Sequence, residues 1–314
     1  MSSEGKVAFL FPGQGSQAAG MGKEAASSYP EARRVFEVAD ETLGFSLSTL
    51  CFEGPDEELR LTENTQPAIL TTSTALAAVV QALGAKPDYV AGHSLGEYSA
   101  LVAGGALSLE DAVTVVRNRG RYMQEAVPLG VGAMAAILGL SVEAVEGVCG
   151  DAAQNEVVEP ANLNGGNQVV IAGHKAAVAR ACELAKERGA RRALPLAVSA
   201  PFHCRLMEPA AVKLKGDLDN TEFSDLDIPL FTNVDAKAIT SGAEAKDALE
   251  RQVASPVLWE AIIDGMVSAG VRRFVELGPG KVLSGLVRKI AKDVETFSVS
   301  SPEGIERLRE ASLV

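Results

Sequence analysis

A short apolar segment that runs directly into a glycine-flanked serine constrains this chain more than any other feature. Residues 88–92 are expected to form a buried strand, and residues 94–104, rich in Ala and Leu, a helix. The segment GHSLG at residues 92–96 lies between them, and a serine on such a sharp turn has a strained backbone that flanking glycines keep clear of side chains. The helix that follows offers free N–H groups and a partial positive charge to a reacting oxygen. We therefore interpret Ser94 as a nucleophile and not as part of a structural turn.

Strands and helices alternate along most of the chain. We expect further strands at residues 6–11, 228–232 and 272–277, and helices at residues 30–43, 67–83, 109–126, 257–269 and 281–291. Strands that alternate with helices of this length are typical of parallel sheets covered by helices. The pattern therefore predicts an α/β fold with a mostly parallel sheet, and the serine turn makes this large domain hydrolase-like.

The middle of the chain has a different order. Strands are expected at residues 132–140, 157–163, 168–173 and 190–198, and helices at residues 141–153, where a Ser cap opens the helix, and 175–188. This β-α-β-β-α-β order is the ferredoxin-like arrangement. We therefore predict a ferredoxin-like subdomain at residues 129–199, inserted into a large domain of residues 1–128 and 200–314.

The charge balance bears on the partners that the chain can bind. Its 314 residues include 41 acidic and 29 basic side chains, a formal net charge of −12. This excess argues against a nucleic-acid binder, whose affinity comes largely from Lys and Arg. The apolar run near the N-terminus is too short for a signal peptide, and residues 67–83 are interrupted by Thr, Ser and Gln, which indicates a buried helix and not a membrane span. We expect a cytoplasmic protein without membrane contact.

The cysteines do not follow a metal-binding or disulfide pattern. No Cys-x-x-Cys pair or Cys/His zinc spacing occurs, and a chain of this length buries a full core without disulfides. We therefore expect no metal and four reduced thiols, at Cys51, Cys149, Cys182 and Cys204.

A serine nucleophile needs a base, and the chain has only three histidines. His93 adjoins Ser94, and the turn points neighbouring side chains apart. His174 ends a subdomain strand, where we expect it to cap the next helix. His203 lies where the chain returns to the large domain, and clefts form at such junctions. Elimination leaves His203 as the base and predicts a pH–rate profile that rises in the ordinary histidine range. The alternative is a surface histidine whose hydrogen bonds are already made and that has no catalytic role.

The sequence does not place an Asp as the third member of a Ser-His-Asp triad, so a backbone carbonyl could orient the ring.

Two glycine-rich turns call for separate interpretations. FPGQGSQ at residues 11–17 formally fits the dinucleotide fingerprint, but the second strand that such a site needs is replaced by the amphipathic helix at residues 30–43. We expect this turn to aim a backbone N–H at an oxyanion, with Gln14 lining the pocket. GPGK at residues 278–281 lacks the six-residue frame of a phosphate loop and is expected to be a tight strand-to-helix turn.

The segment RNRGR at residues 117–121 places three arginines on one helix. Arg117 and Arg121 share a face that we expect to be solvated. Arg119 lies among apolar residues that include Met123, so we expect it to point inward. An inward arginine needs a carboxylate or phosphate partner.

These segments together resemble one enzyme family. FPGQGSQ, AGHSLGEYSAL, RNRGRYMQEAV, GAMAAILGL, NQVVIAGH, the HC pair and ELGPGKVLSGL occur in this order. They are similar to malonyl-CoA:acyl-carrier-protein transacylases of bacterial fatty-acid synthesis, and also to the acyltransferase domains of polyketide synthases. The resemblance covers residues 7–290, nearly the whole chain, and implies a fold with an inserted ferredoxin-like subdomain.

The resemblance implies roles for the reacting residues. Ser94 is expected to be the acylated nucleophile and His203 its base. A main-chain carbonyl near Gln252 is expected to orient the histidine. The backbone N–H groups of Gln14 and Leu95 are expected to form the oxyanion hole.

The resemblance also implies how the acyl group is recognised. Arg119 is expected to hold the free malonyl carboxylate in a two-pronged salt bridge. Phe202 precedes the histidine where some family members carry Ser, and malonyl-selective polyketide domains tend to have Phe there. Phe202 therefore favours malonyl, and Met123 is assigned to the same substrate site.

The implied reaction is a ping-pong acyl transfer without metal or redox cofactor. Malonyl-CoA acylates Ser94, and the phosphopantetheine thiol of acyl carrier protein then takes the malonyl group. A serine esterase or thioesterase on the same turn is the alternative; it predicts a triad Asp between Ser94 and His203 and needs no buried arginine. A non-catalytic carrier-binding module has no use for Ser94 and His203 together with an arginine.

Carrier proteins of this kind are acidic, so a chain with a net charge of −12 needs a local basic patch to bind one. A solvated charged turn is the alternative interpretation of any such cluster. The oligomeric state, the choice of carrier and the tolerance for acetyl or branched acyl-CoA stay open. We expect the patch to consist of Arg188, Arg191, Arg192, Lys281, Arg288 and Lys289.

Overall fold

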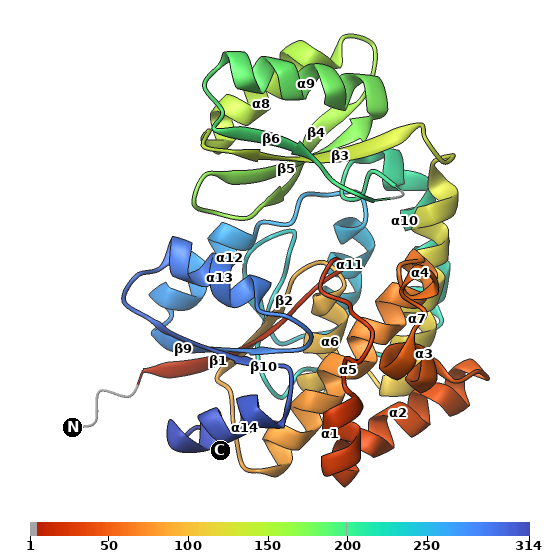
Figure 1. Cartoon of the computed structure of the whole chain (residues 1–314), viewed down its shortest axis with the longest axis vertical. Helices are drawn as coiled ribbons and strands as arrows, with labels where there is room; N and C mark the ends of the chain where they lie inside the picture. Colours follow the sequence, from red (N-terminus) through yellow and green to blue (C-terminus); the bar gives the residue numbers. More distant parts are fainter. Residues whose placement is uncertain (1–4, 199) are drawn as a thin grey trace.

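The chain is organised around two separate β-sheets, which Figure 1 shows one above the other. The computed structural model describes residues 5–198 and 200–314. Within these residues the larger sheet has the strand order β10-β9-β1-β2-β7-β8, and the smaller sheet the order β4-β5-β3-β6. The predicted domain limits include residues 1–4 and 199, which lie outside the described residues.

The larger sheet carries the serine turn. Its strands are β1 (Lys6–Phe11), β2 (Tyr89–Gly92), β7 (Leu230–Phe231), β8 (Ala238–Ile239), β9 (Val271–Leu277) and β10 (Glu295–Val299). Every pairing is parallel except that of β7 with β8, which confirms the mostly parallel sheet. Phe11 at the end of β1 pairs with Gly92 at the end of β2. The loops with Gln14 and Ser94 therefore leave the sheet at the same edge.

Helices cover both faces of this sheet. Phe9 and Phe11 of β1 point to one face and join its apolar cluster. Ala8 and Leu10 point to the other face and join a second cluster, because side chains alternate along a strand. The first face is covered by α5 (Thr62–Ala82) and α6 (Gly96–Ala103), with α2 (Pro30–Leu43) and α7 (Leu109–Ala126) packed against α5, and the second face is covered by α12 (Trp259–Ser268) and α13 (Val282–Ile290).

Some boundaries differ from those expected. Helices α2 and α7 begin and end where the sequence predicts. Helix α5 begins at Thr62 and not at residue 67, with Pro67 inside it. Several elements are not predicted from the sequence: strands β8 and β10, the 3-10 turn at Arg205–Met207, and the helices α1 (Lys23–Ser28), α3 (Leu47–Glu53), α4 (Asp56–Leu59), α10 (Glu208–Asp219), α11 (Gly242–Gln252) and α14 (Pro302–Glu310).

The smaller sheet forms the ferredoxin-like part. Its strands β3 (Gly132–Leu138), β4 (Val158–Leu163), β5 (Gln168–His174) and β6 (Arg192–Pro195) pair antiparallel, and α8 (Val142–Ala153) and α9 (Lys175–Glu187) cover one face. Ser141 caps α8 by accepting a hydrogen bond from the N–H of Ala144. Edge strand β6 is shorter than expected, although the N–H of Leu196, just after Pro195, still donates to the Met134 carbonyl of β3 at 2.9 Å. The order of elements confirms the ferredoxin-like arrangement.

The uncovered face of the smaller sheet packs against the large domain. Met134 and Val170 of this face belong to the same buried apolar cluster as the α5–α7 side of the large domain. The N–H of Leu163 donates to the carbonyl of Val257, and the N–H of Val257 donates to the carbonyl of Ala161, both at 2.9 Å. The two parts are therefore fixed to each other. A cavity lined by residues of both parts, Ser94 among them, lies between them.

Three general features of the described residues bear on the class of protein. Cys51, Cys149, Cys182 and Cys204 are all buried and unpaired. Among the helices at residues 5–198 and 200–314, none is both long enough and apolar enough to cross a bilayer. In the same residues, no three His, Cys, Asp or Glu side chains cluster in a way that could hold a metal ion.

Candidate active site

Ser94 lies on the turn between β2 and α6, in a left-handed backbone conformation with φ of 54°. Such a conformation costs a residue other than glycine about 1–3 kcal/mol. The neighbouring glycines make the turn possible. A Cβ on Gly92 would lie 1.8 Å from the carbonyl carbon of Gly96, and a Cβ on Gly96 would lie 2.0 Å from the carbonyl oxygen of Phe11. Both positions therefore exclude any side chain, and the serine is held where its hydroxyl projects from the sheet edge.

His203 lies in the segment that follows the ferredoxin-like part, and its ring contacts the Ser94 hydroxyl. Its Nε2 lies 2.6 Å from Ser94 Oγ, and its Nδ1 lies 3.0 Å from the main-chain oxygen of Gln252. A carbonyl oxygen only accepts, so Nδ1 carries the proton and Nε2 is free to accept from the serine hydroxyl. This is the tautomer that a general base needs. In the part of the chain that the structure describes, no Asp or Glu side chain takes the place of that carbonyl.

The His203 ring is held in its neutral form. The side chain is buried, and burial is the largest cause that lowers the pKa of His203, to about 3. The nearby positive charge of Arg119 lowers it further, while the hydrogen bond to the Gln252 carbonyl opposes the shift. The ring is therefore unprotonated, and able to accept a proton, throughout the neutral range.

Arg119 points inward, as the sequence predicts, and is 1% exposed. Its partners are not anions: Nη1 donates to Gln66 Oε1 at 2.8 Å, and Nη2 donates to Gln252 Oε1 at 2.8 Å and to Ser94 Oγ at 3.2 Å. The guanidinium also lies 5.6 Å from the centre of the Tyr98 ring. Among residues 5–198 and 200–314 no carboxylate forms an ion pair with Arg119. A buried cation without a direct counter-ion, in contact with a nucleophile, can bind an incoming carboxylate.

The other two arginines of this helix differ from each other. Arg121 is exposed, as expected. Arg117 is half-buried and lies 4.4 Å from the centre of the Phe45 ring, so the prediction that it is solvated is wrong. The aromatic ring covers the guanidinium because the α2–α3 connection packs against this face of α7.

Gln252 links the parts of the site. Its Nε2 donates to the main-chain oxygen of Ser94 at 2.9 Å and to Glu97 Oε2 at 2.7 Å, while its Oε1 accepts from Arg119. Because its main-chain oxygen accepts from His203, this one residue contacts the nucleophile's backbone, the histidine and the arginine.

Glu97 is a buried acid directly behind the serine turn, and only 1% of it is exposed. Burial raises the pKa of Glu97 to about 7, against the opposing effects of hydrogen bonds from Gln252 and Asn233 and the charge of Arg119. The Asn233 side chain holds the turn itself: its Oδ1 accepts from the Ser94 N–H at 2.7 Å, and its Nδ2 donates to the Gly92 carbonyl at 2.7 Å.

Two backbone N–H groups are available to a reacting oxygen. Since the Ser94 N–H is bonded to Asn233, it cannot serve this purpose. The N–H groups of Gln14 and Leu95 have no acceptor among the described residues, and both residues line the cavity beside the serine. This arrangement can stabilise a tetrahedral oxyanion.

The cavity over Ser94 has a volume of about 110 Å³. Both parts of the chain contribute to it, since Met134, Asn162, Leu196 and Val198 come from the ferredoxin-like part. Phe202 and Met123 are buried in its wall. The large domain supplies the remaining wall, which consists of Gln14, Gln66, His93, Ser94, Leu95, Arg119, Met123, Phe202 and His203.

The other two histidines have structural partners. His93 also lines the cavity, with Nε2 2.9 Å from Asn164 Oδ1 and its ring against Trp259. His174 precedes α9, but its side chain makes no capping hydrogen bond. Its Nδ1 instead accepts from the Val157 N–H at 2.9 Å, so the expected capping role is wrong.

Three polar residues of the site are not predicted from the sequence. Glu97 and Gln66 are polar residues within buried stretches of α6 and α5, and a polar residue in such a stretch indicates a buried hydrogen-bond partner. Asn233 follows β7 at the carboxyl edge of the sheet, where binding residues of α/β folds gather. None of the three lies in a spacing pattern that specifies its partner.

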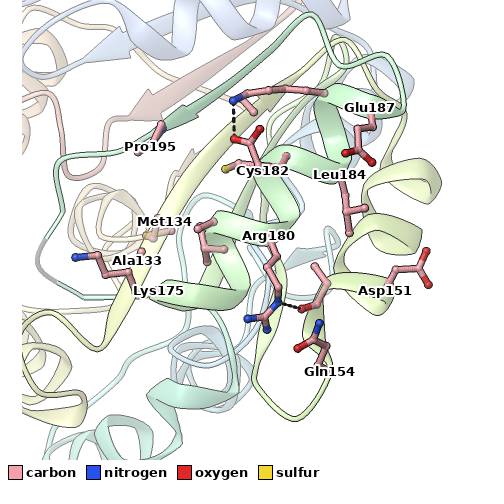
Figure 2. Close-up of a pocket in the computed structure, with 16 residues that line it drawn as sticks. Ala133, Met134, Asp151, Gln154, Lys175, Arg180, Cys182, Leu184, Glu187 and Pro195 are labelled. Atoms are coloured by element: carbon pink, nitrogen blue, oxygen red, sulfur yellow. Dashed lines mark hydrogen bonds and ion pairs between the residues drawn. The ribbon is translucent and has the colours of Figure 1, made fainter.

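A much larger hollow of about 850 Å³ lies on the ferredoxin-like part (Figure 2). It is bordered by α9 and by Ala133 and Pro195 of the neighbouring strands. Two of its charged side chains are engaged locally: Arg180, labelled in Figure 2, donates to the Ala152 carbonyl at 2.9 Å, and Lys186 donates to Glu183 at 2.8 Å. The hollow contains neither Ser94 nor His203, so the smaller cavity is the candidate active site.

Comparisons with known proteins agree with this geometry. The family model "Acyl transferase domain" matches residues 8–304. The malonyl CoA-acyl carrier protein transacylase of Bacillus subtilis is 54% identical over 96% of this chain and 95% of its own length. The acyl carrier protein S-malonyltransferase structure from Vibrio cholerae is 49% identical, with a TM-score of 0.95 over 96% of this chain and 99% of that one. A further structure, of a type II PKS acyl-carrier protein in complex with its malonyl-transacylase, is 44% identical, with a TM-score of 0.95 over 98% and 99%.

Proposed function

This chain belongs to the acyl transferase family, as one of its malonyl CoA-acyl carrier protein transacylases, and on that premise we propose that it transfers malonyl groups through a malonyl-Ser94 intermediate. It is an acyltransferase. One observation carries the proposed intermediate: Arg119 donates to the same Ser94 hydroxyl that lies 2.6 Å from the His203 ring. A base and a carboxylate-binding cation thus converge on one nucleophile.

The first half-reaction forms the acyl-enzyme. Ser94 Oγ attacks the thioester carbon of malonyl-CoA, and His203 Nε2 takes the hydroxyl proton. The carbonyl oxygen becomes an oxyanion that accepts from the N–H groups of Gln14 and Leu95. When the C–S bond breaks, His203 returns the proton to the CoA sulfur, and malonyl-Ser94 is left.

The second half-reaction reverses these steps with another thiol. His203 takes the proton of the phosphopantetheine thiol of acyl carrier protein, and the sulfur attacks the malonyl-Ser94 ester. When the C–O bond breaks, Ser94 Oγ regains the proton. Each half-reaction exchanges one bond of the acyl carbon for another, so we propose that no metal or redox cofactor takes part.

We propose that Arg119 selects the malonyl group. Its fork can form two charge-assisted hydrogen bonds to the distal carboxylate, and burial strengthens them. Gln66 and Gln252 keep the guanidinium in place without competing for it as a carboxylate would. Phe202 and Met123 close the apolar side of the small cavity and limit branched acyl groups.

The alternative reaction is hydrolysis, and the geometry does not favour it. A triad Asp is the usual partner of the histidine in serine hydrolases, but the Gln252 carbonyl occupies that place here. A buried arginine with no carboxylate partner has no use in a general esterase. Quantifying malonyl-thioester and free malonate after mixing the malonyl-enzyme with holo acyl carrier protein tests the proposal, which requires the thioester to dominate.

We propose acyl carrier protein as the partner, as in the complex of the similar malonyl-transacylase. The expected basic residues are all exposed. Lys281 directly precedes α13 and follows Gly280, which lies close to Ser16 in the turn that carries Gln14, and Lys289 near the end of α13 donates to Gln168 at 3.2 Å. Arg191 lies against Gly139. The N–H of Gly139 donates to the main-chain oxygen of Asn167, the residue before the Gln168 that Lys289 contacts.

These contacts support a basic strip along one side of the cleft, formed by Arg191, Arg192, Lys281, Arg288 and Lys289. Arg188 is a weaker member because Asp151 forms an ion pair with it. Rim charges of this kind act mainly on association with an acidic partner. A cytoplasmic location stays a prediction that fits a partner and a substrate of central metabolism.

A further inference from the structure

The proposed mechanism gives no role to Glu97, although this carboxylate is buried within the site. We propose that Glu97 is a positioning residue: it sets the orientation of the Gln252 amide, which then holds Arg119 in place for the substrate carboxylate. This inference rests on the proposed function, because Arg119 is the group that it serves. Glu97 itself touches neither substrate nor the reacting atoms.

The hydrogen-bond types around Gln252 fix its amide in one orientation. Arg119 has only donors, whereas an ionised Glu97 and the Ser94 carbonyl, which both face the amide nitrogen, have only acceptors. The amide oxygen therefore faces Arg119 at 2.8 Å, and the amide nitrogen faces Glu97 at 2.7 Å. The flipped amide would place a donor against the guanidinium and an acceptor against the carboxylate, and both contacts are repulsive.

Glu97 is itself held by the turn that carries the nucleophile. The N–H of Asn233 donates to both carboxylate oxygens at 3.3 Å, and the Asn233 side chain bonds the Ser94 N–H and the Gly92 carbonyl. Residue 97 also lies in the first turn of α6, where a negative charge is stabilised. The carboxylate therefore has a defined position relative to Ser94.

Packing alone does not explain an acid at this position. A leucine or methionine has a similar volume and would not incur the cost of burying a charge. The carboxylate adds hydrogen-bond acceptors, and Gln252 Nε2 donates to one of them, Oε2. The effect on Arg119 follows from the contacts Glu97–Gln252–Arg119, in which each distance is below 3 Å.

The proposal predicts a selective defect. Malonyl transfer needs the Arg119 fork, whereas acetyl transfer needs only Ser94, His203 and the oxyanion hole. Glu97→Gln keeps the size of the side chain but can present either a donor or an acceptor to Gln252, so only Arg119 and the Ser94 carbonyl are left to orient the amide. The loss should therefore be larger for malonyl-CoA than for acetyl-CoA.

The experiment measures acylation of Ser94 by malonyl-CoA and by acetyl-CoA in single turnovers, with the Tm of each variant. In Glu97→Gln the malonyl rate should fall about 10- to 100-fold, the loss expected for a buried hydrogen bond to a charged group, and the acetyl rate by less than about threefold. Glu276→Gln is the matched control. Glu276 is equally buried but accepts from the N–H groups of Leu283 and Ser284 away from the cavity, so its loss should not separate the two substrates.

A double-mutant cycle tests whether Glu97 acts through Gln252. Gln252→Met should show the same malonyl-selective loss, and adding Glu97→Gln to it should cost little more. Additive losses, or equal losses for both CoA esters, would overturn the inference. If Glu97→Gln does not fold, Glu97→Asp, which keeps an acceptor but moves it, must still lose malonyl more than acetyl transfer. Absence of any malonyl adduct in the unmodified protein would instead overturn the proposed function, and this inference with it.

Discussion

Arg119 Nη2 donates to Ser94 Oγ across 3.2 Å, so the buried cation lies against the nucleophile itself. An acyl group attached to that oxygen must therefore extend within reach of the guanidinium. A malonyl group ends in a carboxylate, which matches the cation, whereas an acetyl group brings no charge. The substrate preference should therefore depend on this one side chain.

Arg119→Ala should reduce kcat/KM for malonyl-CoA by about 30- to several-thousand-fold, since a broken buried charge pair costs about 2–5 kcal/mol. Acetyl-CoA should react as before or faster. Arg119→Lys should recover only part of the loss, because a point charge lacks the planar fork. The measurement is kcat/KM for both esters, with Arg121→Ala on the exposed face of α7 as control. A parallel fall for both esters would mean that Arg119 supports the fold and not the selection of substrate.

The pH profile should reflect the burial of His203. The ring acts as a base only when neutral, and its pKa is lowered to about 3. Acylation by acetyl-CoA, which needs His203 but not Glu97, should therefore stay nearly constant between about pH 5 and about pH 8 and fall only in more acidic solution. The sequence alone predicts a rise in the ordinary histidine range, and the structure moves that rise to lower pH. Single-turnover acylation at several pH values measures it, and a limb near the ordinary histidine pKa would contradict the neutral, buried ring described here.

His203→Ala should slow acylation by the roughly 10²–10⁴-fold expected for a lost general base. The remaining rate should increase with pH, because Ser94 must then lose its proton to solvent. His174→Ala is the control, since that histidine bonds only the backbone of the ferredoxin-like part. An unchanged acylation rate in His203→Ala would rule out the assigned base.

Glu97 should make the stability of the protein depend on pH. Its pKa is raised from 4.5 to about 7 by folding, so the folded state binds the proton more tightly and stability is lost as pH rises between these values. As pH rises through this range, the unmodified protein should lose about 3 kcal/mol of unfolding free energy that Glu97→Gln does not lose. Urea unfolding of both proteins at about pH 4.5 and about pH 7.5 measures the difference. A difference that does not vary with pH would show that Glu97 ionises normally in the fold.

The parts of the fold that follow local rules were predictable from sequence. The strand, the glycines and the helix around Ser94 are consecutive, and each is specified by neighbouring residues. The ferredoxin-like order could likewise be read from alternating short segments. Helix α11 was missed because its apolar positions are mostly alanine, which gives a weak periodic signal.

The partners of the site residues could not be predicted in the same way. Arg119 meets Gln66 across 53 residues and Gln252 across 133, and Asn233 meets Ser94 across 139. These contacts depend on the order of strands in the sheet, which places β7 beside β2. The inward direction of Arg119 followed from its helical position, but its amide partners did not.

The basic strip should affect only the second substrate. Replacing Arg191 and Arg192 by Glu should raise the KM for acyl carrier protein several-fold and spare that for malonyl-CoA, because rim charges act on association. The control replaces Arg307 and Arg309 by Glu. Both lie on α14, at the far end of the molecule from the ferredoxin-like part (Figure 1). The KM values for both substrates at two salt concentrations measure the effect. Equal changes for both substrates, or equal changes in the control, would exclude a docking role.

Intact-mass measurement shows directly whether Ser94 carries the malonyl group between two thiols. After mixing with malonyl-CoA, the unmodified protein should gain one malonyl group that maps to Ser94, and Ser94→Ala should gain none while keeping its fold. Adding holo acyl carrier protein should move the group to the carrier thiol faster than water removes it. A malonyl adduct on Ser94→Ala, or release of the group mainly as free malonate, would contradict the account.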